Sequence, residues 1–524
     1  MDVFFSLLPI AFLIGLMLRK QSVPSFIVLP AAAAVMYFFR LTYFETSSRL
    51  VHAGVLDGFF SAWTPILVIW GAVLLFRFLE ETGAIQTLHD WISSIAENPV
   101  EQIMIIAWAF SFFVEGASGF GTPIALAAPI LVGFGFPAAR VLMLCLVMNS
   151  IPVSFGAVGT PTWFGLGNLG LSEPMISSIA QQTALIHFVA SLFIPFLALR
   201  FLLSWKDIRK NAIFILLSVL SCTIPYLALS HLSSEFPSLI GGAIGLGLTI
   251  LFSRANIGVA RSKRKTKKIQ ISSRKLFQAF FPLAGIIVLL VLTRLEFLEL
   301  KSLLTYDDLV AQLSLGEWGK IWLSPALVLG WQNILGTTSS WSHAILYVPS
   351  FLPFFLVVGL SFYFFSIKKS VQRKIWSQTY ERMKKPILAL VGILIFVKLL
   401  MIGEQSPGII LGHFLADITG HLWVLVSPLL GALGSFFSGS NTVSNLTFGG
   451  IQSSIAEDLG FPRSTILSLQ NVGGAMGNMI SIQNIVAGCS VLGLVRQEGK
   501  ILLQTIKPLL WYAVIAGAMG IILI

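Results

Sequence analysis

Small and polar residues interrupt two long apolar stretches of this 524-residue sequence. The first interruption runs from Glu115 to Pro123 and the second from Ser438 to Asn445, each near the middle of its apolar stretch. Later in each half of the chain an asparagine, Asn149 or Asn471, opens a further Gly-rich interruption. Glycine and proline break helices and expose backbone N–H and C=O groups that lipid cannot satisfy. Such breaks persist in a membrane only where they pack against protein or line a solvated cavity.

The four interruptions predict a binding site for a small carboxylate at mid-membrane. A helix that starts at a break carries a partial positive charge of roughly half a unit at its N-terminus, and Ser, Thr and Asn side chains add hydrogen-bond donors. The alternative is that small residues only allow close helix packing. The candidate substrate-binding residues are Ser118, Gly119, Gly121, Thr122, Asn149, Gly159, Thr160, Ser440, Asn441, Thr442, Asn445, Asn471, Asn478 and Ser481.

Two ionisable residues inside apolar segments are candidates for proton coupling. Glu115 immediately precedes the first interruption and His187 lies in the middle of a later apolar segment. A charge at the bilayer centre costs roughly 2.5–3.5 kcal/mol or more, so such residues are rare unless they have a function. The alternatives are that Glu115 caps the adjacent break and that His187 is a packed, hydrogen-bonded core residue.

Other functional classes fit the sequence less well. A sodium-coupled carrier remains an alternative, with the Gly439–Thr442 region and Asn149 or Asn471 as ion ligands. An enzyme would need a catalytic constellation, and no HExxH, GxSxG or clustered His/Cys motif is present. The three cysteines have no paired spacing, so neither a disulfide framework nor a zinc site is indicated. No metal and no cofactor are expected. A channel would show rings of charge or a repeated filter sequence.

The composition is that of a polytopic membrane protein. Apolar residues make up 56% of the chain and charged residues 11%, with a mean hydropathy of +0.87. The net charge of +11 lies in short blocks between apolar segments, such as residues 261–268 and 368–385. Such blocks are typical of cytoplasmic loops, which makes nucleic acid an unlikely partner. The apolar segments lie near 3–18, 23–39, 59–79, 141–161, 177–203, 211–229, 237–253, 277–293, 345–365, 386–403, 464–495 and 503–524.

These segments predict an all-α fold with about twelve transmembrane helices in two inverted repeats. Residues 1–203 form the first repeat, with scaffold spans in 3–79, a re-entrant hairpin at 102–132 and a broken helix at 141–161. Residues 204–276 provide linking spans and a basic cytoplasmic loop. Residues 277–524 form the second repeat, with scaffold spans in 277–403, a hairpin at 421–457 and a broken helix at 464–495. Segment 321–336 is ambiguous, because Trp322 and Trp331 suggest interfacial or partial insertion.

The interruptions carry a resemblance to the bacterial L-lactate permease family of proton-linked monocarboxylate carriers, which includes glycolate permeases. It is specific in four blocks: Phe113–Pro123, Asn149–Pro161, Gly434–Gly449 and Gly473–Ala487. Ser440, Asn441 and Thr442 also resemble a hairpin signature of the wider ion-transporter superfamily, which implies elevator motion of residues 102–203 and 421–524.

The resemblance implies proton symport of L-lactate, D-lactate or glycolate in a bacterial inner membrane, with a homodimer as a candidate assembly. The sequence departs from the family pattern at three positions. Asn478 stands where the resemblance implies lysine, Ile482 where it implies proline and Thr122 where it implies alanine. Because such a lysine would pair with the substrate carboxylate, these departures bear on the identity of the substrate.

Overall fold

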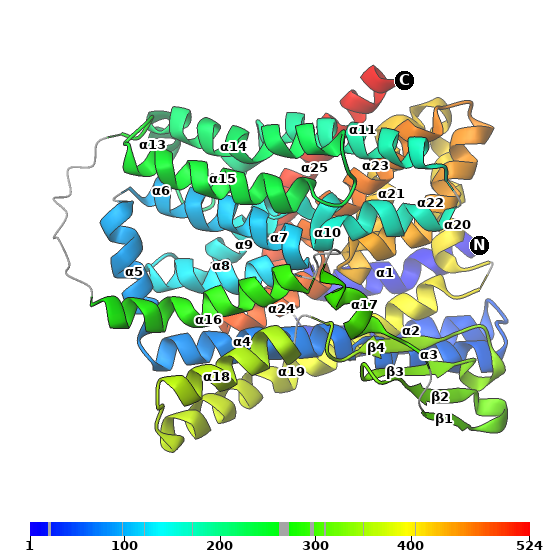
Figure 1. Ribbon diagram of the computed structural model, residues 1–524. Helices are drawn as coiled ribbons and strands as arrows, with labels where there is room; N and C mark the ends of the chain where they lie inside the picture. The colour runs from blue at the N-terminus through cyan, green and yellow to red at the C-terminus, as the bar shows by residue number, and fades with distance from the viewer. Residues whose placement is uncertain are drawn as a thin grey trace. The chain divides into compact units, whose positions relative to one another are not determined.

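The computed structural model describes residues 1–18, 23–96, 98–119, 121–169, 171–260, 272–293, 298–308, 311–348, 351–403 and 405–524. Phe120 of the first interruption and residues 261–271 of the basic loop lie outside the described residues. The described chain is mostly helical (Figure 1). It divides into two compact units. The first comprises Met1–Phe78, Pro282–Leu415 and Val495–Gly499, and the second comprises Leu79–Phe281, Ala416–Leu494 and Lys500–Ile524.

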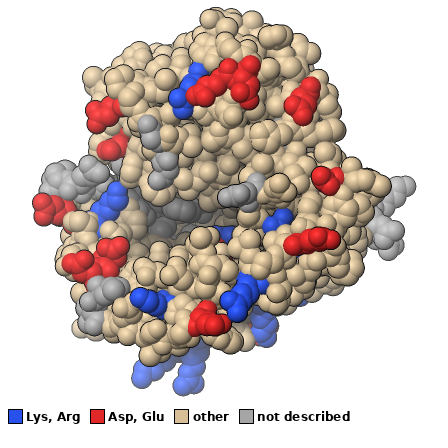
Figure 2. All heavy atoms as spheres, turned by 90° about the vertical axis from the view of Figure 1, so that its right-hand side faces the viewer, with Lys and Arg blue, Asp and Glu red and all other residues tan. Residues whose placement is uncertain are grey.

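Six helical stretches of the described chain are long and apolar enough to cross a membrane, as expected of a multi-pass membrane protein. Charged side chains are sparse on the face shown in Figure 2, where most of the surface is formed by uncharged residues. The expected total of about twelve spans stays a prediction, because several of the expected segments form shorter apolar helices. The six stretches are Pro99–Gly116, Ala212–Ser230, Pro237–Arg254, Pro407–Ser438, Arg463–Leu492 and Glu498–Leu523.

The first unit is built around α19, which packs against α2 and α3. Glycines allow this close approach: a methyl group on Gly58 would lie 2.6 Å from the Ile395 backbone, and one on Gly392 would lie 2.4 Å from Pro30 N. The helices of this unit, including three that run on into or out of the second unit, are α1 (Asp2–Leu18), α2 (Ser25–Thr42), α3 (Ser48–Ser61), α4 (Trp63–Glu81), α16 (Ser273–Leu292), α17 (Leu300–Thr305), η8 (Phe351–Leu356), α18 (Val357–Phe364), α19 (Lys369–Met401) and α20 (Pro407–Thr419).

A small β-sheet in the first unit makes the all-α prediction wrong. Strands β1 (Ala311–Ser314), β2 (Lys320–Leu323), β3 (Val328–Gln332) and β4 (Trp341–Ala344) form an antiparallel meander in the order β1-β2-β3-β4 (Figure 1). Trp322 and Trp331, which suggested membrane insertion, lie on β2 and β3. Trp322 pairs with Gly330 across these strands and its ring covers the glycine. The tryptophans are therefore explained by cross-strand packing.

An ion pair joins two helices of the first unit. Lys398 Nζ on α19 lies 2.7 Å from Asp57 Oδ2 on α3, and Ser61 Oγ donates to the other carboxylate oxygen at 2.9 Å. The Asp57 side chain is 9% exposed and that of Lys398 36%. In the last turn of α2, the buried Arg40 donates to the carbonyl of Ile402 at the C-terminus of α19. Both cations lie where the helix dipole of α19 is negative.

The second unit contains two close helix pairs in its first part. Helices α14 and α15 lie side by side (Figure 1), and α15 also packs on α7, where a methyl group on Gly116 would lie 2.3 Å from Leu239 N. The elements here are α5 (Ala84–Ile95), α6 (Pro99–Ile103), η1 (Met104–Phe110), α7 (Ser111–Ser118), α8 (Thr122–Gly133), α9 (Ala138–Met148), η2 (Pro152–Phe155), α10 (Gly156–Thr160), η3 (Pro161–Leu166), η4 (Gly167–Leu169), α11 (Glu173–Ser191), α12 (Ile194–Leu199), α13 (Trp205–Lys210), α14 (Ala212–Ser230) and α15 (Pro237–Arg254).

The C-terminal part of the chain completes the second unit. Helix α23 packs tightly on α21, because Gly473 lies against the carbonyl of Pro428 and Gly431 against that of Gln470. The elements of this part are η9 (Gly420–Leu422), α21 (Trp423–Ser438), α22 (Asn441–Asp458), α23 (Arg463–Gly477), η10 (Asn478–Ile480), α24 (Ile482–Leu492) and α25 (Glu498–Leu523).

Candidate functional site

The first interruption is a sharp turn between two packed helices. Helix α7 ends at Ser118 and is followed by Gly119, with φ of +61°, and α8 begins after Gly121, with φ of +73°. Only glycine adopts these left-handed conformations at little cost. Thr122 is the first residue of α8 and is followed by Pro123, a residue favoured in a first helical turn. Helices α7 and α8 pack against each other, so the sequence encodes a helical hairpin at this point.

The second interruption has the same form. Helix α21 ends at Ser438 and is followed by Gly439, with φ of +69°. Ser440 caps the start of α22, its Oγ accepting from Val443 N at 3.3 Å. Helices α21 and α22 pack against each other. Asn441, Thr442 and Asn445 therefore lie in the first turns of α22, next to a helix N-terminus.

Both later interruptions are broken helices. Helix α9 ends at Met148, and Asn149 begins an irregular segment through η2, α10 and η3. Asn471 was expected to open the second of these interruptions, but it lies within α23, which continues to Gly477. Residue Asn478 follows in η10, and Ser481 caps α24, its Oγ accepting from Asn484 N at 3.3 Å. The breaks leave a fresh N-terminus at the start of α24.

The starts of three helices meet in the second unit. A methyl group on Gly121, at the start of α8, would lie 3.3 Å from Asn484 Oδ1 in the first turn of α24. A methyl group on Gly439, before the start of α22, would lie 2.8 Å from Gln483 Oε1 in the same turn. The positive ends of α8 and α22 thus each lie beside the positive end of α24. The sequence analysis did not single out Asn484 and Gln483, because nothing in their spacing relates them to the hairpin tips.

Asparagines of α22 and α23 form one buried hydrogen-bond network with residues of η3. Asn441 Nδ2 donates to both Asn471 O and Asn471 Oδ1 at 3.0 Å, and Asn445 Nδ2 donates to Asn471 Oδ1 at 3.0 Å. Asn471 Nδ2 in turn donates to Thr162 Oγ1 at 2.8 Å, and Asn445 Nδ2 also reaches Pro161 O at 2.9 Å. The structure therefore joins the second hairpin to both broken helices through side chains that the sequence singled out, together with Thr162, which it did not.

Glu115 is buried beside the first broken helix. Its Oε2 accepts from Asn149 Nδ2 at 3.0 Å, and its Oε1 lies against Gly156, where a methyl group would be 2.5 Å away. Its exposure is 4%. Within the described part of the chain no Lys or Arg forms an ion pair with it. Protonation of this carboxyl group therefore removes a charge from the protein interior.

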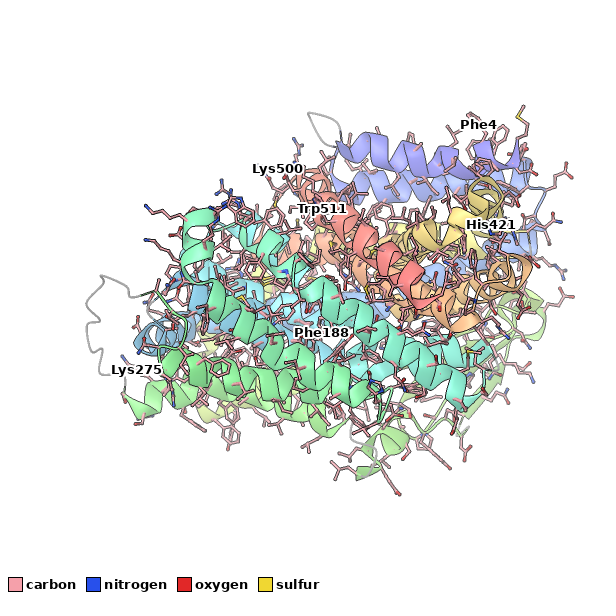
Figure 3. The ribbon with its side chains drawn as sticks, turned by 90° about the horizontal axis from the view of Figure 1, so that it is seen from above. Phe4, Phe188, Lys275, His421, Lys500 and Trp511 are labelled. Atoms are coloured by element: carbon pink, nitrogen blue, oxygen red, sulfur yellow. The ribbon has the colours of Figure 1, made fainter. Side chains whose placement is uncertain are left out.

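His187 is fully buried on α11 and bonded through both ring nitrogens. Its Nε2 lies 2.8 Å from Ser154 Oγ, and its Nδ1 is hydrogen-bonded to the hydroxyl of Tyr512 on α25. Figure 3 shows α11, labelled at Phe188, next to α25, labelled at Trp511. Tyr512 carries no motif and is 325 residues away in sequence, so no sequence signal could identify it.

Several buried polar atoms at the interruptions have no hydrogen-bond partner among the residues that the structure describes. They include Thr122 Oγ1, Asn149 Oδ1, Asn441 Oδ1 and Ser435 Oγ. Leaving a buried donor or acceptor unpaired costs about 1–3 kcal/mol. Four such atoms near helix breaks mark places where a ligand can supply the missing partner.

Of the other predicted residues, Gly159 and Thr160 lie apart from these contacts. Gly159 lies against Ser234 and Glu235, before α15, and Thr160 Oγ1 bonds the carbonyl of Ala157 in its own helix. The backbone of Thr442 lies beside Gly165 of η3. The side-chain oxygen of Asn478 accepts from Asn484 Nδ2. Ser118 ends α7, and its side chain lies outside the described part.

No metal centre is found among the described residues: no three His, Cys, Asp or Glu side chains come together there. Cys145, Cys222 and Cys489 are free and buried. A cavity of about 930 Å³ lies in the first unit, between α2, α3, α19 and the sheet region, and none of its lining residues belongs to the four interruptions. It therefore adds nothing to the candidate site.

The family of the chain follows from comparison with known proteins. A family model described as L-lactate permease matches residues 2–524. A Haemophilus influenzae protein is 46% identical over 520 residues, which are 99% of this chain and 98% of that protein. The Escherichia coli L-lactate permease is 26% identical over 97% of this chain and 93% of its own length. The Escherichia coli glycolate permease is 25% identical over 87% and 84%, respectively. The chain therefore belongs to the L-lactate permease family.

Proposed function

We propose that the chain is a secondary transporter that takes up a small monocarboxylate together with a proton across the plasma membrane of a bacterial cell. L-lactate, D-lactate and glycolate are the candidate substrates. Membership of the family supports this substrate class, since similar proteins are named L-lactate permease and glycolate permease. Permeases move solutes across membranes, so we assign no chemical conversion to this chain.

The meeting of the starts of α8, α22 and α24 carries the proposal. A carboxylate at this point can accept hydrogen bonds from backbone N–H groups and is attracted by the positive ends of the three helix dipoles. Asn478 lies in this region where the family resemblance implies a lysine. Helix N-termini can attract an anion without a lysine, so the departure is compatible with a carboxylate substrate.

The unpartnered oxygens suit a 2-hydroxy acid. Lactate and glycolate both carry a hydroxyl group beside the carboxylate, and this group can donate one hydrogen bond and accept others. Thr122 Oγ1 and Asn149 Oδ1 are buried and unpaired. Thr122 can donate to a carboxylate oxygen, and Asn149 Oδ1 can accept from the 2-hydroxyl group.

Glu115 is the proposed proton carrier. It is buried without a cationic partner in the described residues and contacts Asn149 at the start of the first broken helix. The empty site carries the charge of ionised Glu115. The loaded site carries the charge of the bound anion, because Glu115 is then protonated. The net charge inside the membrane is therefore the same in both states. His187 is the second candidate for proton coupling.

The transport architecture is part of the proposal. About twelve spans in two inverted repeats, with re-entrant hairpins and an elevator-like movement in a homodimer, fit this function. The second unit contains both hairpins and both broken helices, whereas the first contains the early spans of each half and the sheet. This division supports a moving second unit, which carries the substrate, and a first unit that serves as the scaffold.

Sodium coupling is a second candidate, favoured by one observation. Asn441 Oδ1 and Ser435 Oγ are unpartnered, and a methyl group on Gly474 would lie 1.8 Å from the first and 3.4 Å from the second. Two neutral oxygens thus converge over a residue without a side chain. Neutral side-chain and backbone oxygens are the ligands that coupling sodium ions use in transporters.

Uptake of radiolabelled L-lactate into proteoliposomes tests both proposals. With an inward proton gradient and no sodium, accumulation that a protonophore abolishes supports proton symport. Accumulation that requires sodium and ignores the protonophore supports the second candidate. Absence of L-lactate, D-lactate and glycolate uptake under both conditions contradicts the substrate class.

A further inference from the structure

A hydrogen-bond chain connects α25 to the middle of α23. Tyr512 on α25 contacts His187 Nδ1, His187 Nε2 lies 2.8 Å from Ser154 Oγ in η2, and Ser154 Oγ lies 3.1 Å from the carbonyl oxygen of Asn471. All four residues are fully buried. The chain therefore runs through the protein interior, and each of its bonds has to be satisfied from within the protein.

The chemistry of its last member fixes the direction of every bond in the chain. The carbonyl oxygen of Asn471 can only accept, so the single hydroxyl proton of Ser154 points to it. Ser154 Oγ then accepts from His187, which places the imidazole proton on Nε2. Asn441 Nδ2, at 3.5 Å, approaches the same oxygen as a donor and agrees with this direction. A neutral imidazole carries one N–H, so Nδ1 is an acceptor and the hydroxyl of Tyr512 donates to it.

We propose that Tyr512 is a positioning residue that holds neutral His187 in its Nε2–H tautomer and so keeps Ser154 bonded to Asn471. In the other tautomer Nε2 becomes an acceptor, and Ser154 turns its proton to His187. The carbonyl of Asn471, which lies within α23 and also accepts from Asn441 Nδ2, then loses a donor. Tyr512 thereby controls the hydrogen bonding of a broken helix from outside the asparagine network. The consequence for transport rests on the proposed carrier function, whereas the tautomer assignment does not.

Tyr226 provides a matched control. Its ring lies edge-on to His187, with ring centroids 6.2 Å apart, and its hydroxyl bonds the carbonyl of Ile151 at 3.4 Å. It is as buried as Tyr512 and packs on the same imidazole. Tyr226→Phe thus removes a buried hydroxyl near His187 and leaves the bond to Nδ1 intact.

Nitrogen-15 NMR of histidine-labelled protein in lipid tests the tautomer directly, with His187→Gln used to assign the signals. We expect a protonated Nε2 and an unprotonated Nδ1 for His187 in the unmodified chain. Tyr512→Phe should give a mixture of tautomers, and Tyr226→Phe should leave the signals unchanged. A protonated Nδ1 in the unmodified chain overturns the proposal. A Tyr512→Phe spectrum identical to that of the unmodified chain also overturns it.

Transport measurements complete the test. Tyr512→Phe should slow L-lactate uptake about tenfold, the effect expected for one buried hydrogen bond, whereas Tyr226→Phe should slow it much less. Equal slowing by both variants overturns the positioning role. If the unmodified chain shows the expected tautomer and transports none of the three acids, the tautomer assignment stands and the proposed substrate class fails.

Discussion

Glu115 accepts a hydrogen bond from Asn149 at the start of the first broken helix, and its proposed role as proton carrier can be tested by substitution. Glu115→Gln keeps a side chain of the same shape and removes the ability to gain and lose a proton. We expect the variant to lose accumulation of L-lactate against a gradient and to retain exchange of internal for external L-lactate. The measurement is gradient-driven uptake beside counterflow in proteoliposomes.

The control for this prediction is Glu101→Gln. Glu101 is also a buried glutamate of the second unit, but it caps α6 by accepting from Asn98 N and also accepts from Ser253 Oγ. Its replacement should lower stability and leave accumulation by the folded protein intact. Full accumulation by Glu115→Gln would exclude Glu115 as the proton carrier.

Gly121 offers a prediction about substrate affinity. Gly121→Ala forces an alanine into the left-handed region, which costs about 1–2 kcal/mol, and adds a methyl group beside Asn484 Oδ1. Gly135→Ala imposes the same backbone strain at φ of +87°, but no atom lies within 4 Å of its methyl group. We expect both variants to lose similar stability and only Gly121→Ala to raise the KM for L-lactate, by about tenfold. Equal KM values would place the substrate elsewhere.

At the same scale, sequence reasoning located part of the candidate site. Asn441, Asn445 and Asn471 were singled out because amides at helix breaks are unusual in apolar segments, and the structure brings them together. Gly159 and Thr160 have the same local pattern but lie elsewhere. Tyr512 was missed, because a tyrosine in an apolar helix is unremarkable until a tertiary contact identifies its partner.

Between elements of the first unit, the ion pair of Asp57 and Lys398 fixes α3 on α19. Asp57→Asn leaves a half-buried ammonium group without its counter-charge, and we expect a loss of about 2 kcal/mol in unfolding free energy. The double variant Asp57→Asn/Lys398→Met removes both charges and should be more stable than the single variant. Thermal unfolding of the purified protein in detergent provides the comparison. A double variant less stable than the single one would contradict this account.

The attachment of the sheet to α4 should depend on pH. His343 on β4 is hydrogen-bonded through Nδ1 to Thr64 Oγ1 at 2.8 Å, and burial lowers the pKa of its imidazole below the ordinary 6.5. The unfolded chain therefore binds a proton below pH 6.5 that the folded state resists. The contribution of His343 to stability is complete above pH 6.5 and is lost as the pH falls from there toward the lower folded-state pKa.

The test compares thermal unfolding at pH 7.5 and pH 5.5. His343→Gln should reduce the difference between the two pH values, and His52→Gln, at another histidine of the first unit, should preserve it. An unchanged difference in His343→Gln would show that another group is responsible.

The sheet also shows why an element was missed from the sequence. Its strands have four or five residues each, and only β1 alternates between apolar and polar residues along its length. Four alternating residues are too short a run to stand out from the surrounding sequence. Tryptophan next to apolar residues suggests a membrane interface as readily as a strand. The pairing of Trp322 with Gly330 depends on the register of β2 and β3, which the spacing of residues in the sequence does not reveal.

For the molecule as a whole, the two units should respond differently to substrate. If the starts of α8, α22 and α24 hold the carboxylate, L-lactate should slow amide hydrogen exchange in the first turns of these helices. The sheet of the first unit should exchange at an unchanged rate. Hydrogen-exchange mass spectrometry with and without L-lactate measures both, with acetamide, which is neutral, as the control solute. Slowing confined to the first unit would contradict the proposed site.

The family and the mostly helical character of the whole chain were predictable, because the first depends on motifs and the second on composition. The number of spans and the symmetry of the halves stay predictions. Segment lengths alone do not distinguish a helix that crosses the bilayer from one that packs inside the protein.

The three helix starts have a consequence for alkaline conditions. Peptide N–H groups neither lose nor gain protons over the range in which proteins stay folded, whereas the ammonium group of a lysine becomes neutral at high pH. An anion held by amide dipoles therefore experiences the same attraction at pH 6 and at pH 10. In such a carrier, a loss of transport at alkaline pH is caused by the low concentration of protons and not by a lower affinity for the carboxylate.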